Sequence, residues 1–234
     1  MKIILKMAAL LALLLSLVAC SSTTVLLANF NTEPVNSPPA ANQPTGTVEL
    51  SDGAGSVRVV ASPDPAVTNN LVRIAHPTQP APETVLRARF DSFHGTGRYG
   101  FLASVFIPSN TGAVTLDLES FNGSIASAAQ FLHLDFMPEN NVRINDNNAD
   151  RFGTFPRDRT FVVSISVDTT VSPFKATITL LGAGGTASGS KDVTLPAIAN
   201  QFGAVRFWMG FQRTGAFFVD DIIVTRRSSR GPSV

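Results

Sequence analysis

Short runs in which apolar and polar residues alternate, bounded by Gly, Pro, Asn and Asp, recur along most of this chain. A period of two residues is typical of β-strands that bury one face and leave the other solvated. The candidate strands are residues 25–30, 47–50, 57–61, 71–75, 85–90, 99–106, 113–119, 131–137, 141–145, 160–167, 175–181, 204–212 and 217–225. After residue 19 no long helical period appears, although residues 124–130 are compatible with a turn or two. The sequence therefore predicts an all-β fold, an antiparallel two-sheet β-sandwich of the jelly-roll type.

The same alternation predicts which side chains share a solvated face. In the runs 114–119, 131–137 and 205–212, Leu, Val, Met and most Phe residues point inward. The residues predicted to point outward are Asp117, Glu119, His133, Asp135, Arg206, Trp208 and Gln212. An exposed indole can stack on a sugar ring, and the other side chains offer hydrogen bonds to hydroxyls. These seven residues are the candidate glycan-binding set; alternatively, a loop or the Pro-rich segment 31–45 covers Trp208.

The first 20 residues have the composition of a targeting segment. Lys2 and Lys6 precede an apolar stretch from Met7 to Ala19, which matches the charged and hydrophobic regions of a signal peptide. The following Leu17-Val18-Ala19-Cys20 resembles the lipobox of bacterial lipoproteins. The resemblance implies cleavage before Cys20, lipid on its sulfur and an acylated N-terminus, which together give stable membrane anchoring. An ordinary secretory signal or an uncleaved anchor is the alternative.

That resemblance also predicts an address and a domain plan. Ser21, rather than Asp, after the cysteine fits sorting to the outer membrane, so we expect a lipid-anchored protein of the cell envelope. We expect a signal peptide at 1–19, a lipidated anchor and tether at 20–23, one β-sandwich domain at 24–226 and a basic tail at 227–234. Because Cys20 is the sole cysteine, no disulfide stabilises the fold.

Composition limits the partners of the mature chain. Once Lys2 and Lys6 are removed, 16 basic residues remain against 17 acidic ones, a net charge of −1. A nearly neutral chain has no general attraction for nucleic acid, which we exclude as a partner. Seventeen Phe against one Trp and one Tyr indicate that aromatic residues mainly fill the core. Membrane lipid and a polysaccharide or cell-surface glycan are the expected partners.

Three further segments resemble the concanavalin A-like lectin and glucanase superfamily. They are an opening "LLANFN", a central "FGTFPRDRTFVVSISVD" leading into "KATITLLG", and a closing "RFWMGFQRTGAFFVDDIIVT". The last is similar to the terminal strand of laminarinase-type glycoside hydrolases. The resemblance covers most of residues 24–226 and implies the jelly-roll fold and carbohydrate recognition.

The chain departs from the catalytic pattern of those hydrolases. They carry Glu-x-Asp-x-x-Glu on one strand, whereas this chain has Asp117 and Glu119 followed by Ser120, Phe121 and Asn122. Two carboxylates at i and i+2 lie roughly 6–7 Å apart along a strand, a spacing that does not exclude glycosidase chemistry. The third carboxylate is missing, so we expect a non-catalytic binding module. A protein-contact module of the envelope is the alternative, ahead of a hydrolase or a lyase using His133.

Asp220 is a candidate calcium ligand. In "FFVDDIIVT" the alternation places Asp220 on the same side as Ile222 and Val224, so we expect it to turn inward and to need a partner. The resemblance implies that this Asp helps to hold a structural calcium ion near residues 29–31. A buried Asp bonded to loop backbone is the alternative. The run from Asp146 to Asp150 lacks the Gly and Glu of a calcium loop, so we expect a turn there.

Overall fold

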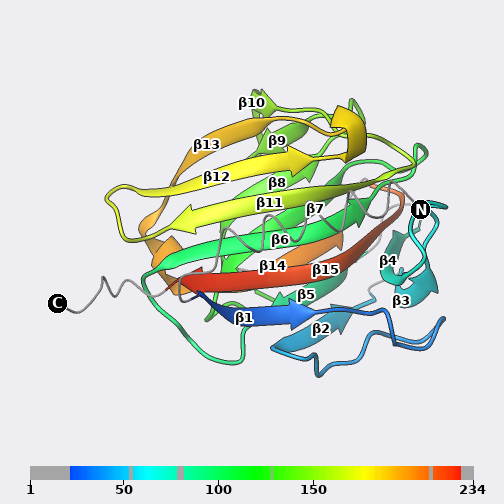
Figure 1. The fold of residues 1–234 in the computed structure, drawn as a ribbon, viewed down its shortest axis with the longest axis horizontal. Helices are drawn as coiled ribbons and strands as arrows, with labels where there is room; N and C mark the ends of the chain where they lie inside the picture. The colour runs from blue at the N-terminus through cyan, green and yellow to red at the C-terminus, as the bar shows by residue number, and fades with distance from the viewer. Residues whose placement is uncertain (1–21, 53–54, 78–81, 128, 211–212, 228–234) are drawn as a thin grey trace.

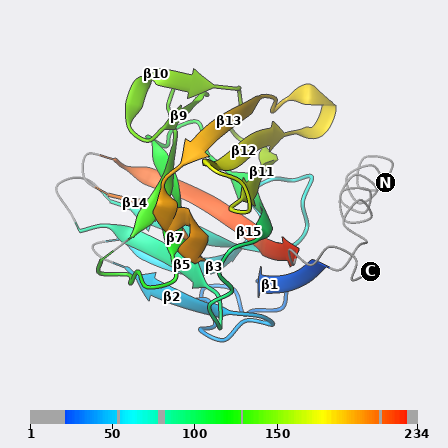
Figure 2. The same cartoon turned by 90° about the vertical axis from the view of Figure 1, so that its left-hand side faces the viewer.

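The computed structural model describes residues 22–52, 55–77, 82–127, 129–210 and 213–227. It contains 57% strand and 4% helix, arranged as two antiparallel sheets packed face to face (Figures 1 and 2). The all-β sandwich expected from the alternation is confirmed. Among the described residues, no helix has the length and hydropathy needed to span a membrane.

The first sheet has eight strands. Its order is β13 (Ser190–Leu195), β12 (Phe174–Leu181), β11 (Thr160–Asp168), β6 (Arg98–Phe106), β15 (Gly215–Arg227), β4 (Asn70–His76) and β3 (Ser56–Ala61), with β1 (Ser22–Ala28) also paired to β15. β15 has 13 residues and is therefore long enough to pair with two strands along one of its edges. The first half of β15 pairs with β4 and the second half with β1.

The second sheet has seven strands. Its order is β10 (Asn147–Phe152), β9 (Val142–Ile144), β8 (Gln130–Phe136), β7 (Val114–Ser120), β14 (Phe202–Met209), β5 (Thr84–Arg89) and β2 (Thr47–Ser51). Two short 3₁₀ helices, η1 (Ala183–Gly185) and η2 (Ala197–Gln201), lie in connections.

Apolar residues from the inner faces of both sheets form one continuous core. Phenylalanines supply much of its volume, as their number predicts. Phe202 makes edge-on contacts with Phe90 and Phe131, and Phe155 stacks on Phe161. Tyr99 belongs to this core too, where it contacts Phe202. Aromatic rings therefore hold the two sheets together without a disulfide among the described residues.

Several local expectations need correction. β10 and β13 were not among the predicted strands because their side chains are mostly exposed and polar, which leaves no apolar alternation to detect. Residues 124–127 form no helix, since small residues and serines there close a turn between Ser124 and Ser127. The segment 31–45 is a long loop after β1, as expected.

A bulge in β15 changes the predicted orientation of Asp220. Asp221 has a positive φ of 50°, and the pairing with β6 shifts register between Asp220 and Ile223. Val219 and Ile222 both belong to the main core, so the extra residue interrupts the alternation there. Asp220 therefore does not share the side of Ile222, although it is fully buried.

Candidate functional site

The outer face of the seven-stranded sheet carries two rows of polar side chains. In one row, Glu49, Arg87, Arg206, Asp117 and His133 occupy paired positions on five adjacent strands. In the next, Trp208, Thr115, Asp135 and Arg143 are similarly paired on β14, β7, β8 and β9. Residues predicted from three separate runs therefore meet on one face, because their strands are neighbours.

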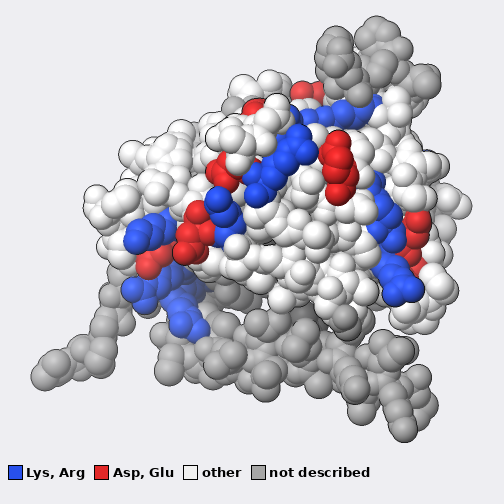
Figure 3. Space-filling model, turned by 90° about the horizontal axis from the view of Figure 1, so that it is seen from above, with Lys and Arg blue, Asp and Glu red and all other residues white. Residues whose placement is uncertain are grey.

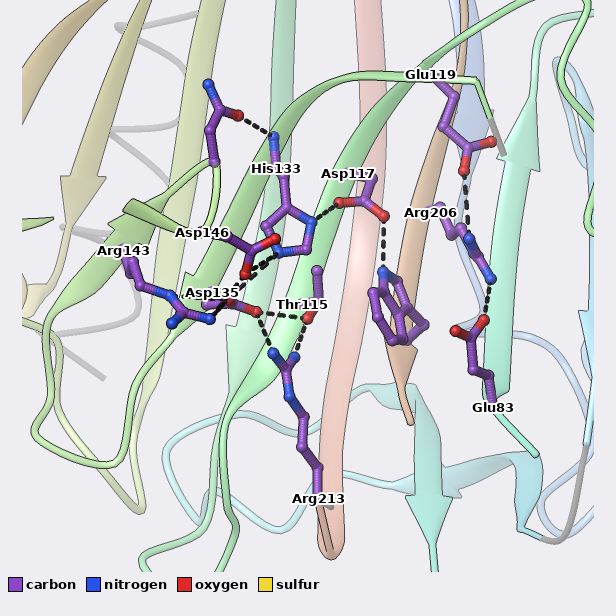
Figure 4. Close-up of polar contacts among 12 residues, drawn as sticks. Glu83, Thr115, Asp117, Glu119, His133, Asp135, Arg143, Asp146, Arg206 and Arg213 are labelled. Atoms are coloured by element: carbon purple, nitrogen blue, oxygen red, sulfur yellow. Dashed lines mark hydrogen bonds and ion pairs between the residues drawn. The ribbon is translucent and has the colours of Figure 1, made fainter. Parts of the chain in front are cut away.

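His133 is the centre of the first group of contacts, which we call the His133 cluster: Asp117, His133, Asp135, Arg143, Asp146 and Arg213 (Figure 4). His133 Nδ1 lies 2.7 Å from Asp117 Oδ1, and its Nε2 lies 3.3 Å from Asp135 Oδ2. Arg143 binds both Asp135, at 2.5 Å, and Asp146, at 2.9 Å. Arg213 binds the other oxygen of Asp135 at 2.8 Å. Three carboxylates thus face two guanidinium groups and one imidazole.

This arrangement controls the charge on His133. Burial alone lowers its pKa, but the hydrogen bonds and negative charges of Asp117 and Asp135 outweigh burial and raise the pKa to about 9. His133 is therefore an imidazolium at neutral pH, and the cluster is balanced at three positive and three negative charges. A protonated histidine with carboxylates at both nitrogens is not available as a general base, which argues against the lyase alternative.

Trp208 is held at the edge of this cluster. Its indole Nε1 donates to Asp117 Oδ2 at 2.7 Å, so both oxygens of Asp117 are engaged. The guanidinium carbons of Arg206 and Arg213 lie 5.2 and 5.5 Å from the indole centroid, within the range of cation–π attraction. Trp208 is partly exposed. The alternative in which a loop covers Trp208 is met in part, because Arg213 belongs to the loop after β14.

A second group, which we call the Glu119 cluster, comprises Glu49, Glu83, Arg87, Glu119 and Arg206. Arg87 is fully buried and bonds to Glu119 at 2.7 Å, to Glu49 at 2.8 Å and to the Gly123 carbonyl oxygen at 2.9 Å. Arg206 bonds to Glu83 at 2.5 Å and lies 3.9 Å from Glu119 Oε1. Burial raises the pKa of Glu119 although Arg87 and Arg206 oppose it. A carboxylate held in this way is a structural partner of arginine.

The predicted solvation of this face is wrong. Asp117, Glu119 and Asp135 have no exposed surface, and His133 and Arg206 are 6% exposed each. The alternation correctly turned these side chains away from the core, but loop residues cover them: Glu83 before β5, Gly123 after β7, Asp146 after β9 and Arg213 after β14. Asp117 and Glu119 are consequently not presented to solvent as a glycosidase pair. Gln212 and Cys20 lie outside the described residues.

Tyr99, the sole tyrosine of the chain, does not lie beside His133. Tyr99 points into the core from β6 of the eight-stranded sheet, and its hydroxyl donates to the Gly95 carbonyl. His133 lies on the outer side of the other sheet.

The sequence interpretation missed six residues of this face: Glu49, Glu83, Arg87, Arg143, Asp146 and Arg213. For Arg87 a signal existed, because an arginine interrupts the apolar run 84–90 at an outward position. Arg143 also alternates with Val142 and Ile144. Glu83, Asp146 and Arg213 lie in loops, where no periodicity predicts direction.

His133, Asp135 and Asp146 bring one possible metal-binding atom each within 4.8 Å of one another. The surrounding charges do not fit a cation there. Arg143 already bonds to both carboxylates, Arg213 bonds to Asp135, and His133 carries a proton where a metal would need a lone pair. The guanidinium of Arg143 supplies the positive charge that an ion would bring.

The Asp220 region fits a hard cation better. Asp220 accepts hydrogen bonds from the Asn69 side chain and, at 3.5 Å, from the Phe30 amide, while Asp221 accepts from Asn29 at 2.8 Å. Burial and the neighbouring Asp221 raise the pKa of Asp220 to about 7. No ion pair among the described residues neutralises either carboxylate. Two carboxylates with nearby amide oxygens are the ligand type that calcium prefers.

Comparison with known proteins identifies the fold of this chain but assigns the chain to no family. No family model matches the chain, and none of the curated proteins matches it. Among solved structures, the catalytic domain of the glycoside hydrolase family 131 protein from Coprinopsis cinerea is similar over 89% of this chain and 95% of its own, with 15% identity and a TM-score of 0.55.

Two further solved structures are a lectin and a phage module. Lectin II from Ulex europaeus matches over 88% of this chain and 100% of its own, with 11% identity and a TM-score of 0.54. The CBM2 module of the evolved Dit of Lactobacillus casei BL23 phage J-1 matches over 90% and 98%, with 12% identity and a TM-score of 0.53. The chain thus has the antiparallel two-sheet sandwich fold of these structures.

Proposed function

We propose that this protein is a lipid-anchored, non-catalytic module of the cell envelope that binds a glycan over Trp208. The observation that carries the proposal is a partly exposed indole on the outer face of the seven-stranded sheet, held in one orientation by Asp117. A fixed aromatic ring offers a sugar an apolar surface at little cost in conformational entropy. The similarity to lectins adds an argument by fold analogy alone.

The polar residues around Trp208 divide into two roles under this proposal. Asp117, His133 and Asp135 are buried and bonded through His133, and buried Glu119 is bonded to Arg87, so these residues position Trp208 and the arginines. Glu83 and Asp146 keep 47% and 67% of their side-chain surface exposed and accept hydrogen bonds from sugar hydroxyls. Arg206 and Arg213 flank the ring.

Retention on insoluble polysaccharides tests glycan binding. Retention of detergent-solubilised Trp208→Ala should be at least about tenfold lower than that of the wild type, because stacked aromatic rings dominate the binding energy of such sites. Phe93→Ala is the matched control, since Phe93 is an exposed aromatic residue in a loop elsewhere, and it should bind like the wild type. Equal retention of both variants would remove Trp208 from the site. Failure of every polysaccharide to retain the wild type would favour the protein-contact role instead.

The non-catalytic part of the proposal has its own test. Incubation of the wild type with each retained polysaccharide should release neither reducing ends nor unsaturated products. If the wild type released such products and Asp117→Asn did not, the result would support the enzyme alternative.

The anchoring part of the proposal concerns Cys20. Cys20→Ser should leave a precursor or a soluble protein, because the acyl chains that would hold the protein in the membrane are absent. Partitioning between detergent and aqueous phases measures this, with the wild type expected in the detergent phase. A serine variant that still enters the detergent phase would refute the lipobox interpretation. Fractionation of inner and outer membranes tests the proposed outer-membrane address.

We also propose a structural calcium ion at Asp220 and Asp221, near residues 29–31. Asp220 is buried and Asp221 half-buried, and no ion pair with a described residue neutralises either carboxylate, which supports the proposal. Calcium would supply positive charge there and would tie β15 to the loop after β1.

A further inference from the structure

We propose that one end of the sandwich lies directly on the membrane surface and binds anionic phospholipid headgroups, an inference that rests on the proposed lipid on Cys20. We call this end the anchor end, and it comprises residues 22–24, 90–98, 168–175, 196–202 and 225–227. In Figure 1 these segments lie at the left-hand side, and in Figure 2 this side faces the viewer.

Register places the anchor end next to the lipid. Ser22 of β1 pairs with Arg227, Arg227 with Arg98, Arg98 with Asp168, and Asp168 with Lys175. These residues form one continuous row across the eight-stranded sheet. Cys20 precedes Ser22 by two residues, which span about 7 Å at most. Because the connection to the proposed lipid is so short, this row of residues must lie close to the bilayer surface.

Exposed apolar side chains gather at the same end. Among the described residues, four large apolar side chains are exposed, and three of them are at the anchor end. Phe93 is 54% exposed, Val171 38% and Ile198 37%. Phe93 and Val171 lie in two different loops and Ile198 in η2, so their grouping does not follow from one local sequence. Apolar side chains flanked by basic ones are the combination that favours the bilayer interface.

The charge at this end is complementary to an anionic surface. Its charged side chains are Arg98, Lys175, Arg226 and Arg227 against Asp91 and Asp168. The loops at the opposite end carry Asp52, Glu83, Glu139 and Asp158 against Arg157, Arg159 and Arg213. In Figure 3 several basic side chains lie at the left-hand end with acidic ones beside them, and both signs also occur over the rest of the visible face. The excess of positive charge nearest the tether attracts the headgroups of anionic lipids.

The side chain of Arg98 is available to lipid phosphates, whereas Arg226 is half-buried. Arg98 pairs with Asp168 at 3.0 Å, but its side chain remains 63% exposed. Arg226 donates to the Thr96 carbonyl oxygen at 2.9 Å and lies over Tyr99, which fixes its direction at the surface. Arginine suits this role because its planar fork matches phosphate oxygens.

Depth measurements on the full-length lipidated protein in vesicles of phosphatidylethanolamine and phosphatidylglycerol test the proposal. Phe93→Cys, Val171→Cys and Ile198→Cys are each labelled with an environment-sensitive fluorophore, since lipid already occupies the Cys20 sulfur. Val35→Cys is the control, because Val35 is 49% exposed and lies in the loop after β1. Nitroxide lipids labelled near the headgroup should quench the three probes about twofold or more above the control.

Two outcomes overturn the proposal and are distinguishable. Equal quenching at all four positions in protein that enters the detergent phase would refute membrane contact while leaving the anchor intact. Protein that never enters the detergent phase would refute the anchor and the contact together.

Charge-removing variants test the lipid chemistry separately. Arg98→Gln combined with Arg227→Gln should reduce quenching of the Phe93→Cys probe, and 0.5 M salt should have the same effect at about the same scale. Arg159→Gln, at the opposite end, is the matched control and should change nothing. Quenching that is unaffected by the double variant and equal in vesicles of phosphatidylcholine would overturn the anionic-headgroup assignment.

Discussion

Trp208 and His133 share one carboxylate: the indole donates to Oδ2 of Asp117, while Nδ1 of His133 binds Oδ1 of the same group. Their ring centroids lie 6.2 Å apart. The only tryptophan of the chain is therefore connected to a buried, charge-balanced cluster, and changes in that cluster should reach the proposed binding surface.

Replacing the indole by a phenyl ring tests this connection. Trp208→Phe keeps an aromatic face but leaves Oδ2 of buried Asp117 without its donor. We expect a loss of about 1–3 kcal/mol in the free energy of unfolding, measured by urea denaturation. Trp208→Phe in combination with Asp117→Asn should lose less than the sum of the two single variants, since they share one bond. Strict additivity would show that the bond contributes nothing.

The charge on His133 predicts a pH dependence of stability. Its pKa of about 9 in the folded protein exceeds the ordinary value of 6.5, so its contribution is fully present below about pH 6.5 and disappears as pH rises through 9. The wild type should therefore exceed His133→Gln in stability by about 3 kcal/mol more at pH 6 than at pH 10. Urea denaturation at each pH measures this difference. A constant difference would contradict the imidazolium assignment.

The Arg87–Glu119 pair predicts a strong penalty for half-removal. Arg87→Met should destabilise the protein by about 3–5 kcal/mol, because Glu119 then remains buried beside no cation at its Oε2. Arg87→Met with Glu119→Gln should recover part of that loss, since the amide carries no charge. If thermal and urea unfolding show the double variant to be worse than Arg87→Met, Glu119 is stabilised by other groups.

Asp220 predicts a second pH effect and a response to calcium. Burial and Asp221 raise its pKa from 3.8 to about 7, so its stabilising contribution as a neutral acid disappears as pH rises from about 4 through 7. Over that range the wild type should lose on the order of 4 kcal/mol of its free energy of unfolding through this group. Asp220→Asn should not show this loss.

Calcium should restore the stability of the wild type at pH 7.5, because the ion neutralises both carboxylates. Thermal unfolding with calcium and with chelator measures the restoration, and Asp220→Asn should show little response. Identical midpoints for the wild type in both conditions would leave Asp220 as a buried side chain bonded to Asn69 and Phe30.

Much of the fold follows from the sequence because alternation is a local property of each strand. The predicted runs 99–106 and 160–167 carry it clearly, whereas alternation does not specify that these two strands, which are far apart in the sequence, pair with each other. β10 and β13 were not predicted, because these edge strands have mostly polar side chains and therefore show no apolar alternation.

The sequence predicts which way the side chains of the site point, but it does not predict that they are buried. Alternation gave the outward orientation of Asp117, His133 and Trp208, because that depends only on each strand. Burial of the carboxylates depends on Arg87, Arg143 and Arg213, which come from other strands and loops. The orientation of Asp220 depends on the bulge at Asp221, and two adjacent aspartates do not reveal an extra residue in a strand.

The pairing of β1 with β15 has a mechanical consequence. β1 runs away from Ser22 along the sheet and holds to β15 through six paired positions, from Ser22–Arg227 to Ala28–Ile222. A pull on Ser22 along the strand axis loads all of these hydrogen bonds in parallel, as in a lap joint, rather than peeling them apart singly. Tension between the N-terminal end and a load held at the opposite end would therefore be resisted by the whole ladder at once.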